Sequence, residues 1–185
     1  MNNKLSNNKK QEFKREALLY LDPLYNLSLK ITRNPEEAKD LVQETYYIAY
    51  RLLHHFQQGT SLKAWLFKIL SNSFLTLYPK RVKEPKIIEY ENVERFIDLM
   101  QEDNDSNIAH VEEDNFINKF STDDVASALN QLPYDFKIAI LLSDMEGFSY
   151  KEIADILECP IQTVRMRISN GRKILQNNLF SHAFK

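Results

Sequence analysis

The residues best suited to chemistry lie near the C-terminus, and they suit recognition of nucleic acid better than catalysis. From residue 159 to residue 185 the chain carries arginines, lysines and amides but no acidic residue. Arginine can pair bidentately with guanine, asparagine and glutamine can pair with adenine, and a methionine can touch a thymine methyl group. The candidate DNA-contacting residues are Gln162, Thr163, Arg165, Met166, Arg167, Ser169, Asn170, Arg172 and Lys173.

Two helices are expected to position these side chains. Ser149 and Glu152 have the spacing of a capping box at the start of a short helix, and a turn follows at Glu158–Cys159. A second helix should begin near Pro160. Its expected inner side consists of Ile161, Val164, Ile168 and Leu175. This pattern predicts a helix-turn-helix, which places its second helix in a DNA major groove.

One alternative to the helix-turn-helix stays open, namely an ordinary helical hairpin with a polar outer side. The absence of acids along the whole second helix argues against that alternative, because a merely solvated helix face usually carries both signs of charge. Gly171 falls inside the second helix and weakens the prediction for its last turns.

The N-terminal part of the chain predicts a second helical module. Asp22 is the expected N-cap of a helix that starts at Pro23, and Asn34 the N-cap of a helix that starts at Pro35. Ser61 can cap a further helix, which Pro79 should end. Trp65 could stack on a base, but it lies on the apolar stripe of this helix and is better interpreted as a core anchor.

The amino-acid composition further limits the possible classes of fold and function. The scarcity of glycine (3 residues) favours helices over turn-rich strands, and a single cysteine excludes a disulfide within the chain. We expect an all-α protein with one helical domain at 10–84, an acidic flexible linker at 85–121 and a second domain at 122–180. No glycine-rich phosphate loop, nucleophile motif or metal-ligand cluster occurs, so neither catalysis nor a cofactor is expected. No apolar stretch approaches a membrane span, so we expect a cytoplasmic protein without membrane insertion.

Longer motifs carry a family resemblance. GFSYKEIADILECPIQTVRMRI resembles region 4 of bacterial sigma factors of the sigma-70 family, specifically the extracytoplasmic-function (ECF) subclass. YLDPLYNLSLKITRNPEEAKDLVQETYYIAYR resembles the front of region 2, and GTSLKAWLFKILSNSFLTLY resembles its rear. The resemblance implies a sigma factor that binds core RNA polymerase and directs transcription initiation at particular promoters. Promoter DNA and an anti-sigma factor are further implied partners.

The resemblance assigns the DLVQET motif to docking on the clamp helices of the largest polymerase subunit. The candidate polymerase-binding residues are Asp40, Leu41, Gln43, Glu44 and Tyr47. Four of them recur at helical spacing away from the buried stripe and end in an aromatic, which suits a partner helix rich in arginine. Without the resemblance, a solvated helix face would explain the same row.

The resemblance also assigns reading of the melted −10 promoter element to the loop before Ser61 and to the helix after it. Polar groups there can contact base edges, and cations can follow the strand. The candidates are Gln57, Gln58, Thr60, Ser61, Lys63, Lys68, Asn72, Lys80 and Arg81. The second helix of the helix-turn-helix would read the −35 element. The chain departs from the family pattern at Pro79, Gln162, Ser169 and Asn170.

Two choices remain open at the level of sequence. The acidic linker can mimic RNA in the polymerase exit channel, as the resemblance implies, or can be a plain spacer. The chain can also be a stand-alone helix-turn-helix regulator whose first 80 residues serve as a sensor or dimerisation module. An enzyme is the least favoured class, because Asp40 and Glu44 are surface residues by periodicity and not a catalytic pair.

Overall fold

The computed structural model describes residues 2–56, 60–79 and 122–183, and within them the chain is helical with no strand. The all-α prediction is therefore confirmed for this part of the chain. The first module contains α1 (Asn2–Leu18), α2 (Leu21–Thr32), α3 (Pro35–Arg51), a 3-10 turn (Leu53–His55) and α4 (Leu62–Leu77). The second contains α8 (Thr122–Gln131), α9 (Tyr134–Ile140), a π-helical turn (Leu141–Met145), α10 (Tyr150–Leu157) and α11 (Ile161–Ala183). The region predicted as the acidic linker lies outside the described residues.

Side-chain caps set the starts of two helices in the first module, α3 and α4. Asn34 caps α3, because its Oδ1 accepts hydrogen bonds from the backbone N–H groups of Glu36 and Glu37 at 2.9 and 3.4 Å. Ser61 caps α4 by accepting from the N–H of Ala64 at 3.2 Å. The prediction for Asp22 was wrong in detail. Helix α2 already begins at Leu21, so Asp22 lies in its first turn, where a carboxylate favours the positive end of the helix dipole.

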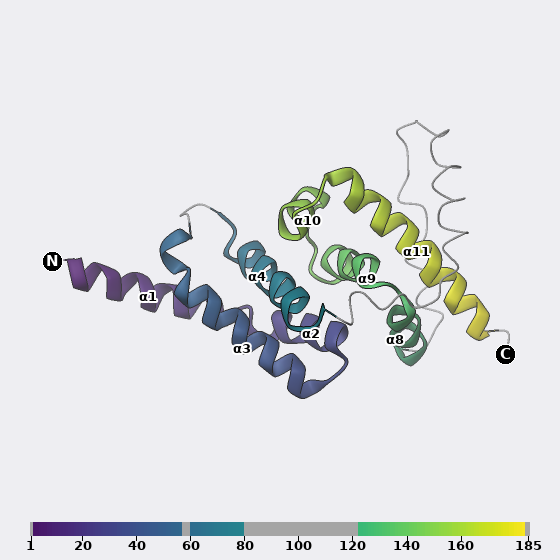
Figure 1. Cartoon of the computed structure of the whole chain (residues 1–185), viewed down its shortest axis with the longest axis horizontal. Coiled ribbons are helices and arrows are strands. Elements are labelled where there is room, and N and C mark those ends of the chain that lie inside the picture. The colour runs from purple at the N-terminus through teal and green to yellow at the C-terminus, as the bar shows by residue number, and fades with distance from the viewer. Residues whose placement is uncertain (1, 57–59, 80–121, 184–185) are drawn as a thin grey trace.

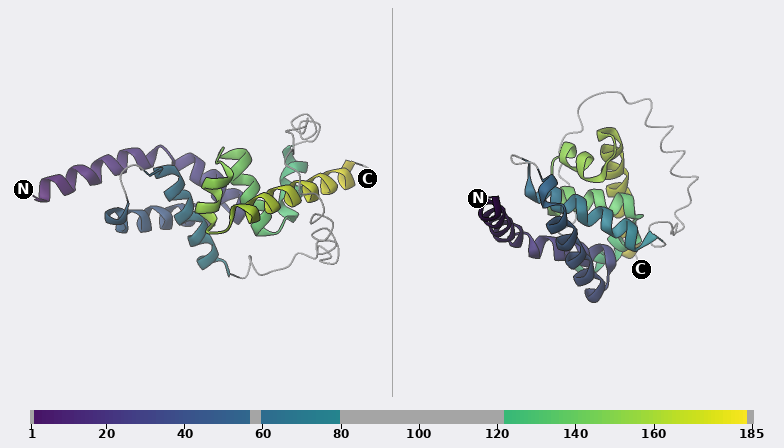
Figure 2. Two further views of the ribbon diagram at one scale, coloured as in Figure 1. Left: turned by 90° about the horizontal axis from the view of Figure 1, so that it is seen from above. Right: turned by 60° about the vertical axis from the view of Figure 1, so that its left-hand side comes forward.

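The first module is held together by an apolar core between α2, α3 and α4. Leu24, Leu27, Leu41, Leu66 and Leu70 are fully buried there. Helix α1 projects from the other helices in Figures 1 and 2 and joins the core through its C-terminal half, where Phe13 and Ala17 are buried.

The second module is built around the predicted helix-turn-helix, which the structure confirms. The capping box at the start of α10 is complete: the N–H of Ser149 donates to Glu152 Oε2 at 2.8 Å, and the N–H of Glu152 donates to Ser149 Oγ at 3.3 Å. The Ser149 hydroxyl also donates to Glu152 Oε2 at 2.7 Å, and this bond and the one from the Ser149 N–H lower the pKa of Glu152, the hydroxyl contributing most. Glu158 ends α10 in the left-handed region at φ 51°, and α11 follows as one helix through Gly171.

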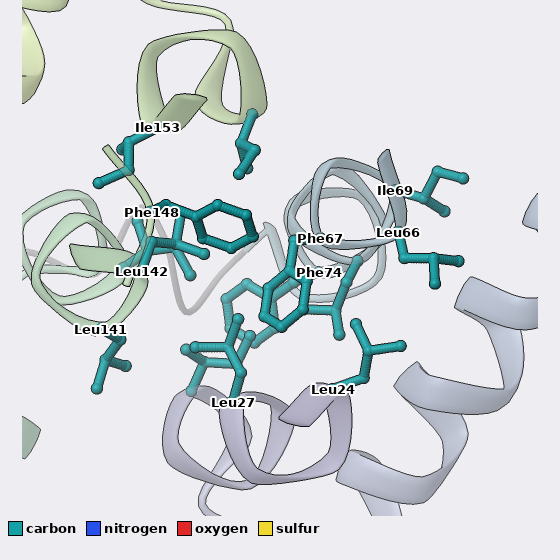
Figure 3. Close-up of a cluster of buried hydrophobic side chains, with 14 of the residues drawn as sticks. Leu24, Leu27, Leu66, Phe67, Ile69, Phe74, Leu141, Leu142, Phe148 and Ile153 are labelled. Atoms are coloured by element: carbon teal, nitrogen blue, oxygen red, sulfur yellow. The ribbon is translucent and has the colours of Figure 1, made fainter. Parts of the chain in front are cut away.

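The two modules share one apolar core. Phe67 of α4 meets Phe148 of the second module edge to face with ring centroids 5.2 Å apart, and Phe74 stacks on Tyr134 at 4.8 Å. Figure 3 shows Phe67 and Phe74 between Leu27 on one side and Leu142 and Phe148 on the other. We call this contact between α4 and the second module, made by Phe67, Phe74, Tyr134 and Phe148, the seam. It places α4 between α3 and the second module (Figure 1).

Candidate nucleic-acid and polymerase interfaces

Helix α11 has two opposite faces. Its buried face carries Val164, Ile168, Gly171 and Leu175, which recur at helical spacing and are at most 5% exposed where a value is given. The other face carries a row that we call the outer stripe. Its members are Gln162, Arg165, Met166, Ser169 and Lys173. All of them are exposed except Ser169, which is half-buried, and their spacing of three or four residues puts them on one side of the helix.

The remaining candidates on α11 are less free to contact a ligand. Thr163 is half-buried. The guanidinium of Arg167 lies 3.1 Å from a carboxylate oxygen of Asp135, and that of Arg172 lies 2.7 Å from Asp144. Both arginines therefore flank the outer stripe and are already paired with acids of the second module.

Two placements on α11 predicted from sequence were wrong. Asn170 was expected on the outer side but is only 8% exposed, and its Oδ1 has no hydrogen-bond partner within the described part of the chain. Ile161 was expected on the inner side but is exposed. The position of Asn170 follows from its neighbour Gly171, which faces the body of the molecule. A Cβ added to Gly171 would lie 2.7 Å from Ile140 Cδ1 and 3.1 Å from Phe136 Cβ, so α9 and α11 approach closely there.

Helix α3 carries the second candidate surface. Asp40 and Gln43 are exposed, Glu44 is half-buried, and Tyr47 is 55% exposed. Leu41, which was included among the binding residues, is fully buried and cannot present its side chain. We call the row Asp40, Gln43, Glu44, Tyr47 and Tyr50 the α3 ridge. Tyr50 was missed, although its place three residues after Tyr47 and its 51% exposure continue the row.

The third candidate surface begins at the N-terminus of α4. Thr60, Ser61 and Asn72 are exposed, and Lys63 and Lys68 are half-buried. Gln57, Gln58, Lys80 and Arg81 lie outside the described residues, so their predicted roles stay predictions. Trp65 packs against the rings of Phe13 and Phe56, with centroids 6.3 and 4.9 Å away, in agreement with its interpretation as a core anchor.

The two lysines of α4 contact the second module. The ammonium of Lys63 donates to the backbone carbonyl of Glu146 at 2.6 Å and lies 3.3 Å from the Glu146 carboxylate. The ammonium of Lys68 lies 2.9 Å from a carboxylate oxygen of Glu158. Beside these pairs is a cleft of about 460 Å³. Its polar and aromatic lining includes Thr60, Ser61, Trp65 and Lys68 from the first module and Glu152 and Asp155 from the second.

The described residues contain neither a cluster of metal ligands nor a membrane-spanning helix. No group of three or more histidine, cysteine, aspartate or glutamate side chains there could hold a metal ion. None of the helices in that part of the chain has the length and apolar character needed to cross a membrane.

Comparisons with known proteins address both modules. The family model described as Sigma-70 region 2 matches residues 18–84, and the model described as Sigma-70, region 4 matches residues 122–175. The chain is 31% identical over 165 residues to the ECF RNA polymerase sigma factor EcfG of Rhodopseudomonas palustris, covering 89% of this chain and 83% of that protein. It is 32% identical to the ECF RNA polymerase sigma factor SigE of Mycolicibacterium smegmatis, but spans only 60% of that protein's length.

Solved structures show the same arrangement of helices. The sigma factor RpoE in its co-crystal structure with the anti-sigma factor NepR from Bartonella quintana superposes with a TM-score of 0.66. That match has 32% sequence identity and covers 91% of this chain and 97% of RpoE. CnrH, solved with the cytosolic domain of CnrY, matches in fold with a TM-score of 0.63 at 22% identity, over 92% of this chain and 89% of CnrH. With both regions matched in order and close relatives aligned along most of its length, the chain belongs to the sigma-70 family of RNA polymerase sigma factors, in the ECF subclass.

Proposed function

We propose that this chain binds core RNA polymerase and directs it to particular promoters, with residues 122–180 reading the −35 element and residues 10–84 docking on polymerase and reading the −10 element. The observation that carries the proposal is the outer stripe of α11. It is an exposed row of base-pairing and cationic side chains on a helix without a single acid, held by a capped helix-turn-helix.

The α3 ridge supports the polymerase part of the proposal. The exposed carboxylate of Asp40 and the half-buried carboxylate of Glu44 alternate with amide and aromatic groups, and such a row complements a partner helix that carries arginines. Two tyrosines more than half exposed offer the rigid aromatic anchors that dominate protein interfaces. The phosphodiester chemistry then belongs to the polymerase, so the chain itself needs no catalytic group or cofactor and acts in the cytoplasm.

An anti-sigma partner is part of the same proposal. A chain whose polymerase- and DNA-binding surfaces are exposed needs those surfaces covered when transcription from its promoters is not required. The relative RpoE was solved with the anti-sigma factor NepR.

Run-off transcription tests the proposal. Purified chain and core polymerase are incubated with genomic fragments, and the expected result is a small set of discrete transcripts that core polymerase alone does not make. Sequence-specific duplex binding by the chain without any polymerase-dependent transcript would instead support a stand-alone regulator.

Matched variants test the α3 ridge in the same assay. Asp40→Ala removes an exposed carboxylate of the ridge and should raise the concentration of chain needed for half-maximal transcription by about tenfold. Glu12→Ala removes an exposed carboxylate from α1 and should leave that concentration unchanged. Equal behaviour of the two variants would reject docking through the ridge.

A further inference from the structure

We infer that one side of α1, together with the end of α3, binds the melted promoter strand next to the −10 element. We call this surface the α1 patch. Its members are Lys10, Lys14, Tyr50 and Arg51, all of them exposed. The match to Sigma-70 region 2 begins at residue 18, so the two lysines lie outside it. The inference rests on the proposed function, because it takes the start of α4 to be the −10 surface.

Helix α1 carries opposite charges on its two sides. The buried Phe13 marks the side that faces the other helices. Since successive helical residues turn by about 100°, Lys10 and Lys14 lie about 60° and 100° from Phe13 in one direction. Glu12 and Glu16 lie about as far from Phe13 in the other direction. All four side chains are exposed, so α1 has one basic and one acidic side.

The basic side of α1 is the side that meets the end of α3. The ammonium of Lys10 lies 5.5 Å from the centroid of the Tyr50 ring, and the guanidinium of Arg51 lies 5.5 Å from the centroid of the Tyr47 ring. Both tyrosines are more than half exposed. Cations and exposed rings thus alternate across one surface. Proteins that bind single-stranded nucleic acid use this arrangement, because bases stack on the rings and phosphates follow the cations.

The two ends of α3 suit partners of opposite charge. The acids of this helix all lie before residue 45, at Glu36, Glu37, Asp40 and Glu44. From residue 45 onward α3 carries no acid and it ends in Arg51, beside the basic side of α1. A partner rich in arginine complements the acidic half, whereas the other end needs a negatively charged partner. Among the partners of the proposed function, promoter DNA is the polyanion.

A purely structural role explains only part of the α1 patch. Arg51 lies in the last turn of α3, where a cation favours the negative end of the helix dipole, and Lys10 covers the ring of Tyr50. Lys14 makes no hydrogen bond, ion pair or ring contact within the described part of the chain. It is an exposed cation beside the other two, and a phosphate gives it a partner.

The α1 patch continues the −10 surface. Phe13, which lies between Lys10 and Lys14 in the sequence, packs on Trp65 with ring centroids 6.3 Å apart. Trp65 is in the first turn of α4, the helix that Ser61 caps. Figure 1 shows α1, the end of α3 and the start of α4 at the same end of the first module. A strand held at the start of α4 therefore has the α1 patch beside it.

Binding of holoenzyme to single-stranded oligonucleotides tests the inference. One probe carries the −10 element of a promoter found by run-off transcription, and a second adds about ten nucleotides on each side. The double variant Lys10→Ala, Lys14→Ala should bind the longer probe about tenfold more weakly than wild type, because two phosphate contacts are lost. It should bind the shorter probe as wild type does. Equal affinity for the longer probe, or the same loss on both probes, would overturn the inference.

Two matched variants separate charge from structure. Glu12→Ala, Glu16→Ala makes two changes at the same spacing on the other side of α1 and should not weaken binding to the longer probe. Lys10→Arg, Lys14→Arg keeps both charges and should keep the affinity. A loss as large in either of these proteins would show that α1 acts through its fold and would reject phosphate binding.

The salt dependence gives an independent arm. For single strands, the logarithm of the binding constant falls with the logarithm of the salt concentration by about 0.7 for each phosphate contact. The slope measured with the longer probe should therefore be shallower by about 1.4 in Lys10→Ala, Lys14→Ala than in wild type. An unchanged slope would contradict the assignment of these lysines to phosphates.

Failure of this inference differs from failure of the proposed function. A wild-type holoenzyme that makes promoter-specific transcripts, while Lys10→Ala, Lys14→Ala binds both probes normally, rejects the α1 patch alone. A chain that gives no polymerase-dependent transcript and no binding of the shorter probe rejects the proposed function, and the inference with it. Binding to a −35 duplex, which lacks the melted strand, should be the same for the double variant and wild type.

Discussion

Two tyrosine hydroxyls differ in what they contact. The Oη of Tyr46 donates to the carbonyl oxygen of Ala17 at 2.7 Å and so ties α3 to α1. The Oη of Tyr134 is buried in the seam with no hydrogen-bond partner among the described residues. Burial raises the pKa of both phenols, that of Tyr46 to about 12 and that of Tyr134 further.

This difference predicts opposite outcomes for the same substitution. Tyr46→Phe removes one of the two hydrogen bonds that the Ala17 carbonyl accepts, the other coming from the Tyr20 N–H at 3.0 Å, and should lower the free energy of unfolding by about 1 kcal/mol. Tyr134→Phe removes a hydroxyl that was already unsatisfied and should leave stability unchanged or raise it. Denaturant unfolding at pH 7 distinguishes them, and a larger loss for Tyr134→Phe would show that its hydroxyl is bonded after all.

The dependence of the free energy of unfolding on pH follows from the raised pKa values of these tyrosines. In the unfolded chain a tyrosine titrates near its ordinary pKa of about 10, whereas Tyr46 holds its proton until about pH 12 in the folded chain. Between these values the folded chain binds more protons, so stability is fully present below pH 10 and falls as pH rises toward 12. Tyr46→Phe should make this fall shallower in unfolding measurements at pH 9, 10 and 11, and an unchanged slope would contradict the assignment.

Base recognition is also decided by single residues. Arg165 is exposed at the centre of the outer stripe, so Arg165→Ala should weaken holoenzyme binding to a −35 duplex by about 1–3 kcal/mol, with the loss concentrated at one base pair. Lys14→Ala removes an exposed cation from α1 and is the matched control. A uniform loss across all −35 sequences would assign Arg165 to a phosphate rather than a base.

At the scale of elements, the helix caps could be predicted from the sequence. The rotation of each helix about its own axis, which decides the side chains that are buried, could not. Asn34, Ser61 and the Ser149–Glu152 box each act within three residues of themselves, so the sequence alone was enough to predict them. Asn170 was misplaced because the rotation of α11 is set by the close approach of Gly171 to Ile140, a tertiary contact. Helix α4 was expected to bury one stripe but buries two, because it packs on α3 and on α10.

The capping box makes a quantitative prediction for α10. Ser149→Ala removes the acceptor for the Glu152 N–H and the donor to its carboxylate, and should cost about 1 kcal/mol at pH 7. Because the pKa of Glu152 is lowered in the folded chain, its contribution is present above the ordinary value of 4.5 and is lost as pH falls through the folded value. The penalty should therefore shrink in acid. Ser127→Ala, at an exposed position within α8, should cost no stability and should have the same effect at both pH values, because alanine favours a helix more than serine does.

Gly171 makes another prediction, for the crossing of α9 and α11. Alanine gains about 1 kcal/mol of helix propensity over glycine, but its Cβ would overpack a site where such strain typically costs about 1–3 kcal/mol. Gly171→Ala should lose about 1 kcal/mol net. Ile140→Val removes the Cδ1 atom that the new methyl meets, so the double variant should be more stable than the sum of the two single changes predicts. Strict additivity in a double-mutant cycle would rule out this contact.

At the scale of the whole molecule, the order of the two regions could be predicted but their contact could not. Phe67 and Phe148 are 81 positions apart, and neither helical periodicity nor a cap signal relates them. The pairs of Glu146 with Lys63 and of Glu158 with Lys68 could not be predicted from the sequence for the same reason. The seam joins α4, whose start is the proposed −10 surface, to the second module.

The central claim is tested most directly by a gel shift. The DNA is a promoter fragment that run-off transcription has identified. The claim is that the outer stripe of α11 and the start of α4 serve promoter DNA only when the α3 ridge is bound by polymerase. Holoenzyme should shift the fragment at a concentration about a hundredfold or more below that needed for the chain alone, because polymerase presents both DNA-binding surfaces together. Equal affinities of the free chain and the holoenzyme would contradict the claim.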